Sequence, residues 1–245
     1  MKKIRLFVAK DNLDLGTTIK LCDNDFDYLI KVMRQKVGDR FFVFNGVDGE
    51  FVAQITAVEK KYLTAEIGEK ISELKKVPNV TLAFAPIKNV RIDFIAEKAT
   101  ELGVARFQPI LTQRTIVDKI NLERFRANAK EACEQCERND FPEIFPPKKL
   151  EKFLNEEETK EKILILCDES GQGLKASLIL PTLRQAQRDQ EKEIVILIGP
   201  EGGFSESEFA KMRQLKNLFS ISLGPRILRA DTAMISALTL VQEFL

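Results

Sequence analysis

The fold is decided by the stretch Ile194-Val195-Ile196-Leu197-Ile198-Gly199-Pro200-Glu201-Gly202-Gly203-Phe204-Ser205. Its first five residues form a continuous apolar run, which is typical of a strand buried on both faces in a parallel sheet covered by helices. The run ends in a glycine-rich loop, and glycine permits positive φ and close backbone approach to a ligand. Ser205 and Glu208 have the spacing of a capping box, so a helix is predicted to begin directly after the loop.

Two further strands are expected on the same grounds, at residues 163–167 and 218–223. Each is followed by a loop, the first beginning Asp168-Glu169-Ser170-Gly171 and the second beginning at Gly224. Ligands of open α/β sheets bind beyond the carboxyl ends of the strands, so three such loops predict one shared pocket. Strands and helices are also predicted to alternate from residue 80 onward, with strands at 80–85 and 107–111 and a helix at 123–138.

The glycine loop does not match the common nucleotide-binding motifs. It contains neither G-x-G-x-x-G nor G-K-[ST], and it has no lysine for a triphosphate. A neutral, adenosine-like ligand held by backbone groups fits the loop better. Taken alone, the loop is equally consistent with a plain tight turn.

The second loop reads Leu223-Gly224-Pro225-Arg226-Ile227-Leu228-Arg229. Gly224-Pro225 predicts a turn, and Asp231 suits the N-cap or first turn of the helix that follows. Small residues in that helix would allow close packing against a neighbouring group, and ordinary helix packing is the alternative explanation.

The first part of the chain indicates a different architecture. Residues 40–44, 50–58 and 61–67 are strand candidates, separated by the turn signals Asn45-Gly46 and Asp48-Gly49. One helical insertion is expected at residues 26–35. Several short strands close together suggest a small barrel, and the polar stretch 68–79 predicts a domain boundary at about residue 72.

Composition narrows the chemistry. The chain has 245 residues, a net charge of +1 and no histidine, which excludes Ser-His-Asp and Cys-His catalysis. Cys133 and Cys136 form a C-x-x-C pair inside a helical pattern, so we expect buried small residues, no zinc site and no other metal. No apolar run approaches the roughly 18 residues of a membrane span. The N-terminus does not resemble a signal peptide, so a cytoplasmic location is expected.

Several segments together resemble the RsmE family of 16S ribosomal RNA (uracil-N3) methyltransferases, of the SPOUT superfamily. The two loops, 199–205 and 222–233, carry the most specific part of the resemblance. The supporting segments are Val32-Met33-Arg34, Gly38-Asp39, Phe44-Asn45-Gly46, the helix 91–104 with Lys98-Ala99-Thr100-Glu101-Leu102-Gly103-Val104, and Glu134-Gln135-Cys136-Glu137-Arg138. The chain departs from the family pattern at Asp27-Tyr28, where paired histidines are frequent, at Cys136, where serine is frequent, and at Asp231, where glutamate is frequent.

This resemblance implies a fold and a cofactor. The expected fold is a PUA-like β-barrel RNA-binding domain at residues 1–72, followed by an α/β trefoil-knot methyltransferase domain at residues 73–245, in a homodimer. The expected cofactor is S-adenosyl-L-methionine. The residues implied to bind it are Cys167, Asp168, Ile198, Gly199, Pro200, Glu201, Gly202, Gly203, Ser222, Leu223, Gly224, Ile227, Leu228 and Arg229.

Methyl transfer to uracil N3 requires loss of the N3 proton. Arg229 or Arg114 is expected to stabilise the resulting anion, and Glu201 or Asp231 to accept the proton. Each acid also has a structural interpretation, as a loop ligand or a helix cap. Basic residues concentrate in segments 1–40 and 86–130, and acidic residues in 151–170. The expected phosphate contacts are Lys31, Arg34, Lys88, Arg91, Arg114 and Arg138.

Other functions remain open from the sequence. A related knotted enzyme could methylate a ribose 2′-OH or a transfer RNA instead. A non-catalytic RNA-binding assembly factor could also have kept the fold. A generic nucleotide-binding protein is disfavoured by the missing phosphate-loop motifs.

Overall fold

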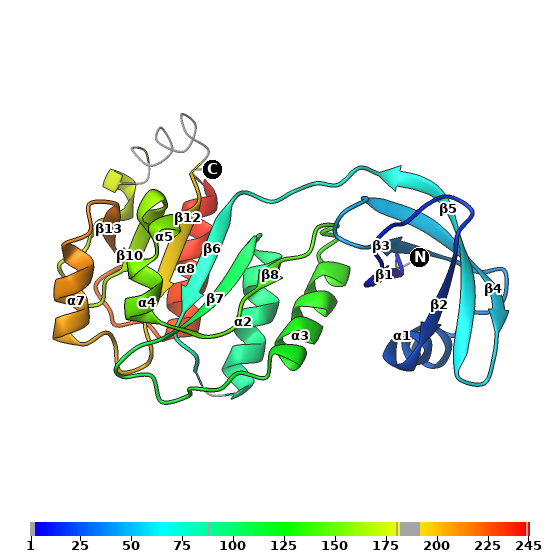
Figure 1. The fold of residues 1–245 in the computed structure, drawn as a ribbon, viewed down its shortest axis with the longest axis horizontal. Helices are drawn as coiled ribbons and strands as arrows, with labels where there is room; N and C mark the ends of the chain where they lie inside the picture. Colours follow the sequence, from blue (N-terminus) through cyan, green and yellow to red (C-terminus); the bar gives the residue numbers. More distant parts are fainter. Residues whose placement is uncertain (1–2, 88, 180, 182–191, 244) are drawn as a thin grey trace. The chain divides into compact units, whose positions relative to one another are not determined.

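A computed structural model describes residues 3–87, 89–179, 181, 192–243 and 245 (Figure 1). The chain divides into two compact units. The first comprises Met1–Lys76 and Cys133–Phe141, and the second Val77–Ala132 and Pro142–Leu245. The sequence did not suggest that residues 133–141 belong with the N-terminal segment, because this association is made by contacts far apart in the chain. The proposed boundary between residues 72 and 73 stays a prediction.

The first unit is built on a five-stranded sheet in the order β1-β3-β4-β5-β2. Strand β1 (Arg5–Phe7) is parallel to β3 (Arg40–Phe44), and β3, β4 (Glu50–Val58), β5 (Tyr62–Ser72) and β2 (Thr18–Cys22) pair antiparallel. Alternating residues of these strands, such as Ile19, Leu63 and Ala65, bury one face of the sheet in a hydrophobic core. Strand β5 extends five residues into the polar stretch 68–79, in which we expected the domain boundary.

The predicted helix at residues 26–35 differs from the observed one. Helix α1 (Asp23–Asp27) begins three residues earlier and continues into a π-helical turn, η1 (Tyr28–Val32). Phe26 and Leu29 are buried against the sheet, which explains the apolar spacing. Arg34 follows with a positive φ of 56°.

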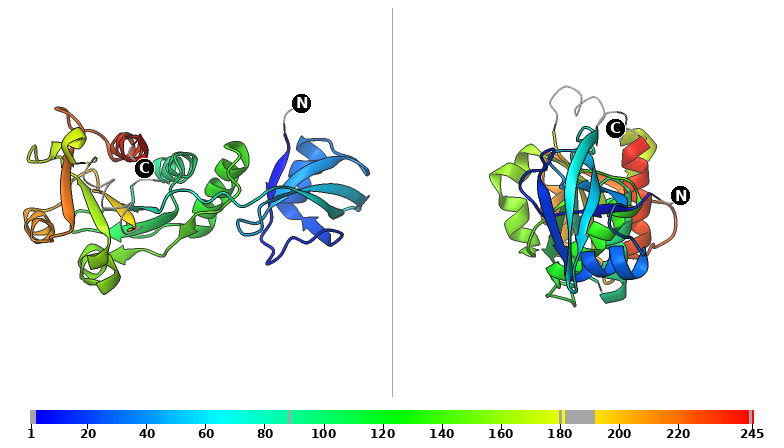
Figure 2. Two further views of the ribbon diagram at one scale, coloured as in Figure 1. Left: turned by 90° about the horizontal axis from the view of Figure 1, so that it is seen from above. Right: turned by 90° about the vertical axis from the view of Figure 1, so that its right-hand side faces the viewer.

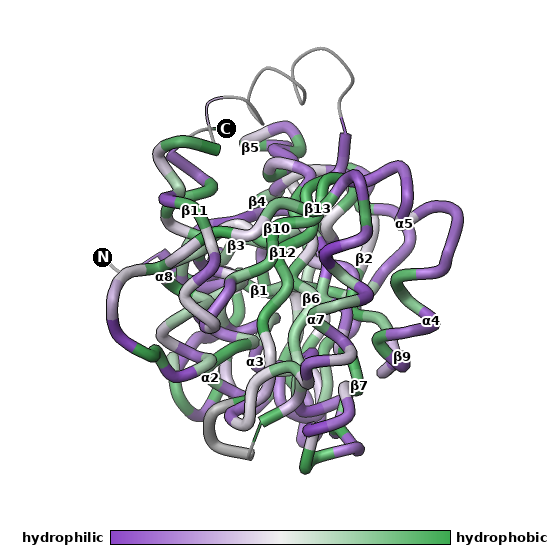
Figure 3. The backbone as a smooth tube through the Cα atoms, turned by 90° about the vertical axis from the view of Figure 1, so that its left-hand side faces the viewer, coloured by the Kyte–Doolittle hydropathy of each residue, from purple (hydrophilic) through white to green (hydrophobic). Residues whose placement is uncertain are grey.

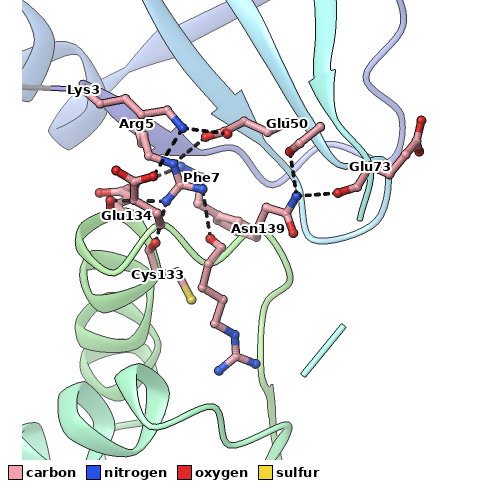
Figure 4. Close-up of polar contacts among 11 residues, drawn as sticks. Lys3, Arg5, Phe7, Glu50, Glu73, Cys133, Glu134 and Asn139 are labelled. Atoms are coloured by element: carbon pink, nitrogen blue, oxygen red, sulfur yellow. Dashed lines mark hydrogen bonds and ion pairs between the residues drawn. The ribbon is translucent and has the colours of Figure 1, made fainter. Parts of the chain in front are cut away.

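A buried arginine organises the first unit (Figure 4). The side chain of Arg5 is 1% exposed and forms an ion pair with Glu50. Its guanidinium also donates to the carbonyl oxygens of Cys133 at 2.7 Å, Glu134 at 3.3 Å and Arg138 at 3.1 Å. These are carbonyls at and after the end of helix α3 (Leu122–Gln135), where backbone acceptors have no helical partner. Arg5 therefore caps this helix and fixes residues 133–141 in the unit.

The second unit is a parallel sheet in the order β11-β13-β10-β12-β6-β7-β8, with β9 also pairing with β7. The central strands are β13 (Leu218–Ser222), β10 (Ile163–Cys167), β12 (Ile194–Ile198), β6 (Val80–Phe84) and β7 (Arg106–Leu111). The short strands β8 (Glu143–Ile144), β9 (Lys148–Lys149) and β11 (Leu174–Lys175) lie at the margins. All residues of β6, β10 and β12 are buried. The continuous apolar runs predicted this for β10 and β12, and Figure 3 shows both as hydrophobic strands.

Helices cover both faces of this sheet (Figure 2). Helices α2 (Asn89–Glu101), α3 and α8 (Ala230–Glu243) lie on one face, and α4 (Leu150–Asn155), α5 (Glu157–Glu161) and α7 (Glu206–Arg213) on the other. On the second face, Phe153 of α4 and Met212 of α7 pack onto Leu164 and Val195 of the central strands. The loops that follow β10, β12 and β13 are thus held by a rigid, fully packed sheet.

Candidate active site

A hollow of about 520 Å³ opens at the carboxyl ends of β10 and β13. This volume lies within the roughly 300–1,000 Å³ typical of small-molecule sites. Its position is the one expected for a ligand of a parallel sheet. The hollow is lined by Cys167, Asp168, Glu169, Gly171, Lys175, Ala176, Ser222, Leu223, Gly224, Pro225, Arg226, Ile227, Leu228 and Ala233.

Asp168 is held firmly in the wall of the hollow. Its side chain is fully buried, and its carboxylate accepts hydrogen bonds from the backbone N–H of Ser170 at 2.8 Å and from the Ser170 hydroxyl. Arg213, in the last turn of α7, forms an ion pair with the same carboxylate at 3.3 Å. The charge of Asp168 is thus compensated within the protein. The Asp168 side chain contributes mainly by shaping the loop after β10.

Cys167 also has a structural character. The side chain is buried at the end of β10, and burial raises the pKa of its thiol to about 12. The thiol is therefore protonated near neutral pH. Because only the thiolate is a strong nucleophile, Cys167 is expected to be unreactive. Cys133 is buried too, and burial raises its pKa to about 12, whereas Cys136 is exposed. The expectation that both C-x-x-C residues are buried was wrong for Cys136, which lies just beyond the end of α3.

Glu169 connects the hollow with the glycine loop at residues 199–203. Its carboxylate accepts a hydrogen bond from the backbone N–H of Phe204. It also lies directly against Gly203, where an added Cβ would overlap Glu169 Oε1. Gly203 has a φ of +67° and donates to the carbonyl oxygen of Pro200 at 2.9 Å, which closes a tight turn. A glycine is needed here both for the backbone conformation and for the approach of Glu169.

The other side of the glycine loop is held by Arg114. Its guanidinium donates to the carbonyl oxygen of Gly202 at 2.9 Å. The neighbouring Gln113 donates its backbone N–H to Glu208 Oε1 at 2.8 Å, and its side-chain amide to Ser207 at 3.1 Å. Residues 112–115 are thereby fixed to the first turn of α7.

The predicted capping box of α7 is confirmed. Ser205 Oγ accepts from the backbone N–H of Glu208 at 3.2 Å, and Glu208 Oε2 accepts from the backbone N–H of Ser205 at 2.8 Å. Glu208 is buried and therefore serves two backbone donors, one in its own helix and one at Gln113.

The structure brings together part of the expected cofactor set. Cys167, Asp168, Ser222, Leu223, Gly224, Ile227 and Leu228 line the hollow, as two of the three loops were expected to do. Ile198, Gly199, Pro200, Glu201, Gly202, Gly203 and Arg229 are not in its wall. Glu169 links residues 199–203 to the hollow. The prediction that all three loops bind one ligand stays a prediction.

Several lining residues were not assigned from the sequence. Glu169 directly follows Asp168 in the loop after a buried strand, so its position was a usable signal. Lys175 ends β11, a two-residue strand that pairs with β13, and Ala176 directly follows it. Such a short strand shows no periodicity in the sequence.

The expected catalytic side chains differ in their surroundings. Arg229 and Glu201 are exposed and form no ion pair among the described residues. Arg114 contacts the glycine loop. Asp231 is an acidic residue in the first turn of α8, one of the two positions expected for it, and accepts a hydrogen bond from the backbone N–H of Thr232 at 2.8 Å.

The expected RNA contacts are equally varied. Arg34 is exposed, and Lys31 is exposed with an ion pair to Asp27 at 2.8 Å. Lys88 and the side chain of Arg91 lie outside the described residues. Arg138 is buried, and its guanidinium is bound by the carboxylate of Asp140 at 2.6 Å. An RNA contact of Arg138 would require breaking this buried pair, which argues against it.

A larger hollow of about 880 Å³ lies at the opposite, amino ends of the strands. Its charges are largely paired within the protein. Glu193 forms ion pairs with Arg106 at 3.4 Å and Lys162 at 3.2 Å, and Lys148 pairs with Glu156 at 2.8 Å. Among the described residues no helix is long and apolar enough to cross a membrane, and no cluster of ligating side chains could hold a metal ion.

Comparisons with known proteins agree with this architecture. Residues 73–242 match the model of an RNA methyltransferase domain, and residues 21–68 match that of an RNA methyltransferase PUA domain. The chain is 33% identical to ribosomal RNA small subunit methyltransferase E of Rickettsia conorii, over 99% of this chain and 96% of the relative. The chain belongs to the RsmE family. The resemblance found in its two loops is thereby confirmed.

Two solved structures of similar proteins have the same fold. Ribosomal RNA small subunit methyltransferase E from Neisseria gonorrhoeae, solved bound to S-adenosyl methionine, has a TM-score of 0.82 at 29% identity, covering 98% of this chain and 97% of that one. A Legionella pneumophila protein solved with bound cofactor SAM has a TM-score of 0.84 at 31% identity, covering 99% and 98%. The expected class, a PUA-like domain followed by a SPOUT-type α/β domain, is therefore confirmed.

Proposed function

We propose that this protein transfers the methyl group of S-adenosylmethionine to N3 of a uracil in 16S ribosomal RNA. The observation that carries the proposal is the 520 Å³ hollow at the ends of β10 and β13, lined by the loop that bears the family motif. The relatives that match almost the whole chain are named as small-subunit ribosomal RNA methyltransferases.

The lining of the hollow fits S-adenosylmethionine. Leu223, Ile227 and Leu228 offer apolar surface for an adenosine group, and the backbone of 222–224 offers hydrogen-bonding groups. The lining also offers charges of both signs, a negative one at Glu169 and positive ones at Lys175 and Arg226. The cofactor carries charges of both signs as well. It supplies a methyl group activated by a positively charged sulfur.

The protein has to orient the uracil, stabilise its anion and receive the N3 proton. We assign the anion-stabilising role to Arg229 or Arg114, since a cation near a developing negative charge lowers the barrier most in a water-poor site. Glu201 and Asp231 are the proposed proton acceptors. Holding the reacting atoms in line provides the rest of the rate enhancement, which suits a chain without histidine.

The further parts of the proposal concern the whole protein. We assign RNA binding to a PUA-like domain at residues 1–72, and methyl transfer to a trefoil-knotted domain at 73–245, in a cytoplasmic homodimer without metal. Arg34, exposed and in a left-handed conformation, is the best supported phosphate contact, because strained backbone is often retained at functional sites.

The test uses the full chain, labelled S-adenosylmethionine and small ribosomal subunits that lack the modification. Methylation of a single uridine at N3, mapped by nuclease digestion and mass spectrometry, is the expected result. Label on a ribose 2′-OH or on transfer RNA would replace the proposed target with that of a related enzyme. A folded protein that binds RNA but not S-adenosylmethionine would be a non-catalytic assembly factor.

A further inference from the structure

Glu169 touches both the hollow and the glycine loop. It lines the hollow beside Asp168, accepts the N–H of Phe204 and lies against Gly203. The positive φ of Gly203 and its missing Cβ leave room for this carboxylate. The backbone is therefore shaped to admit an acidic side chain at this point.

The charge of Glu169 is not compensated as that of Asp168 is. Asp168 has Arg213 as an ion-pair partner, but Glu169 forms no ion pair with any described residue. Arg114 acts on it only at longer range. The other charged side chains in the lining apart from these two acids, Lys175 and Arg226, are both positive. Glu169 is thus the available negative charge in the wall of the hollow.

We propose that the Glu169 carboxylate is a specificity-determining group that favours the cationic methyl donor over its neutral-sulfur product. This inference rests on the proposed function of the hollow. S-adenosylmethionine and S-adenosylhomocysteine share the adenosine group, the ammonium and the carboxylate, and they differ in the methyl group and the positive charge on sulfur. A carboxylate attracts the sulfonium but not the thioether.

Such a preference would serve turnover. After methyl transfer the charge on sulfur is gone, so the attraction that favoured donor binding no longer retains the product. Interactions that hold substrate and product equally would only slow product release, which limits many enzymes.

The pH dependence follows from the state of the carboxyl group. Burial raises the pKa of Glu169 above its usual range. The hydrogen bond from the Phe204 N–H lowers this pKa, and the negative charge of Asp168 raises it further. Only the ionised form attracts the sulfonium. The affinity for S-adenosylmethionine should therefore be highest at pH values above this raised pKa and fall as the pH drops through it. The affinity for S-adenosylhomocysteine should change little.

The experiment is calorimetric titration of the full chain with each of the two compounds, for wild type, Glu169→Gln and Glu206→Gln. Glutamine keeps an acceptor for Phe204 and removes the charge. Glu206 is an exposed acid in the first turn of α7 and serves as the matched control. Glu169→Gln should weaken donor binding about tenfold, the equivalent of about 1.4 kcal/mol, and change product binding less than twofold. Glu206→Gln should leave both affinities unchanged.

The outcomes separate this inference from the proposed function. Wild-type protein that binds neither compound would refute the proposed function itself. Wild type that binds both, with Glu169→Gln weakening both equally or neither, would overturn the inference alone, and equal weakening would make Glu169 a loop-positioning residue. Glu169→Asp, which retains the charge, should recover part of the donor preference, and thermal melting of each variant reports whether it is folded.

Discussion

At the scale of single residues, Gly203 and Glu169 depend on each other. Gly203 has a left-handed φ of +67°, and the Glu169 carboxylate occupies the space that a Cβ would need. A side chain at residue 203 would thus have two effects. It would strain the backbone by about 1–2 kcal/mol, and it would push Glu169 away from the glycine loop.

Gly203→Ala is therefore expected to lower both the free energy of unfolding and the affinity for S-adenosylmethionine. Gly16→Ala is the matched control, because Gly16 has a φ of +80° with no atom within 4 Å of the added Cβ. The control should show the loss of stability, about 1 kcal/mol, with donor affinity unchanged. Chemical denaturation and calorimetric titration measure the two effects. Unchanged donor binding in Gly203→Ala would mean that the contact with Glu169 has no role in the site.

At the scale of elements, the first turn of α7 joins three segments. Glu208 closes the capping box with Ser205 and at the same time accepts the N–H of Gln113. Arg114, next in the chain, binds Gly202. The glycine loop is consequently held between α7 and residues 112–115, and its conformation depends on a carboxylate that does not line the hollow.

Glu208→Ala should destabilise the protein more than Ser205→Ala. Loss of an N-cap hydroxyl costs about 1 kcal/mol, whereas loss of the buried Glu208 carboxylate leaves two backbone donors without their acceptor and should cost roughly 2–3 kcal/mol. Urea unfolding measures both, with the exposed Glu206→Ala as control. Donor affinity should fall in Glu208→Ala but hold in Ser205→Ala. Equal affinities would show that residues 112–115 do not position the loop.

The elements also show what the sequence could predict. Continuous apolar runs correctly predicted β10 and β12, and residue spacing predicted the capping box, because these signals are local. The short strands β8, β9 and β11 were not predicted, since two residues carry no periodicity and form a strand only by pairing with distant neighbours. The position of Glu169 after a buried strand could have marked it as a site residue. Its contacts with Gly203 and Phe204, more than 30 residues away in the chain, could not be predicted locally.

At the scale of the whole molecule, the segment 133–141 belongs to the unit formed by the N-terminal residues. The motif Glu134-Gln135-Cys136-Glu137-Arg138 contributed to the family resemblance, and its observed contacts are structural. Glu134 Oε1 accepts the N–H of Phe7 at 2.9 Å, Arg138 offers its carbonyl oxygen to Arg5, and Phe141 stacks on Phe7 with ring centroids 4.4 Å apart. No local pattern in the sequence could have revealed this, because Arg5 and Cys133 are separated by 128 positions.

Arg5 is expected to be the most sensitive position of this unit. Arg5→Met removes one of the two cationic partners of the buried Glu50 and the donor for three carbonyl oxygens (Figure 4). Removing one member of a buried ion pair typically costs about 3–5 kcal/mol. Lys3 remains 3.0 Å from Glu50 in this variant, so we expect a loss near the lower end of that range. Lys3→Met is the control, since Lys3 is about one-third exposed and shares the same Glu50; its loss should cost about 1 kcal/mol or less.

Intrinsic fluorescence can follow this unit selectively. The chain has no tryptophan and only two tyrosines, Tyr28 and Tyr62, and both lie in the first unit. Their emission in a denaturant titration should report early unfolding in Arg5→Met. The double variant Arg5→Met/Glu50→Met should regain part of the loss, because the buried Glu50 carboxylate, left with only the partly exposed Lys3, is then absent. A double variant as unstable as Arg5→Met would show that the carbonyl oxygens of 133–138, rather than Glu50, are the partners on which the unit depends. Either result identifies which contacts of Arg5 keep residues 133–141 in the N-terminal unit.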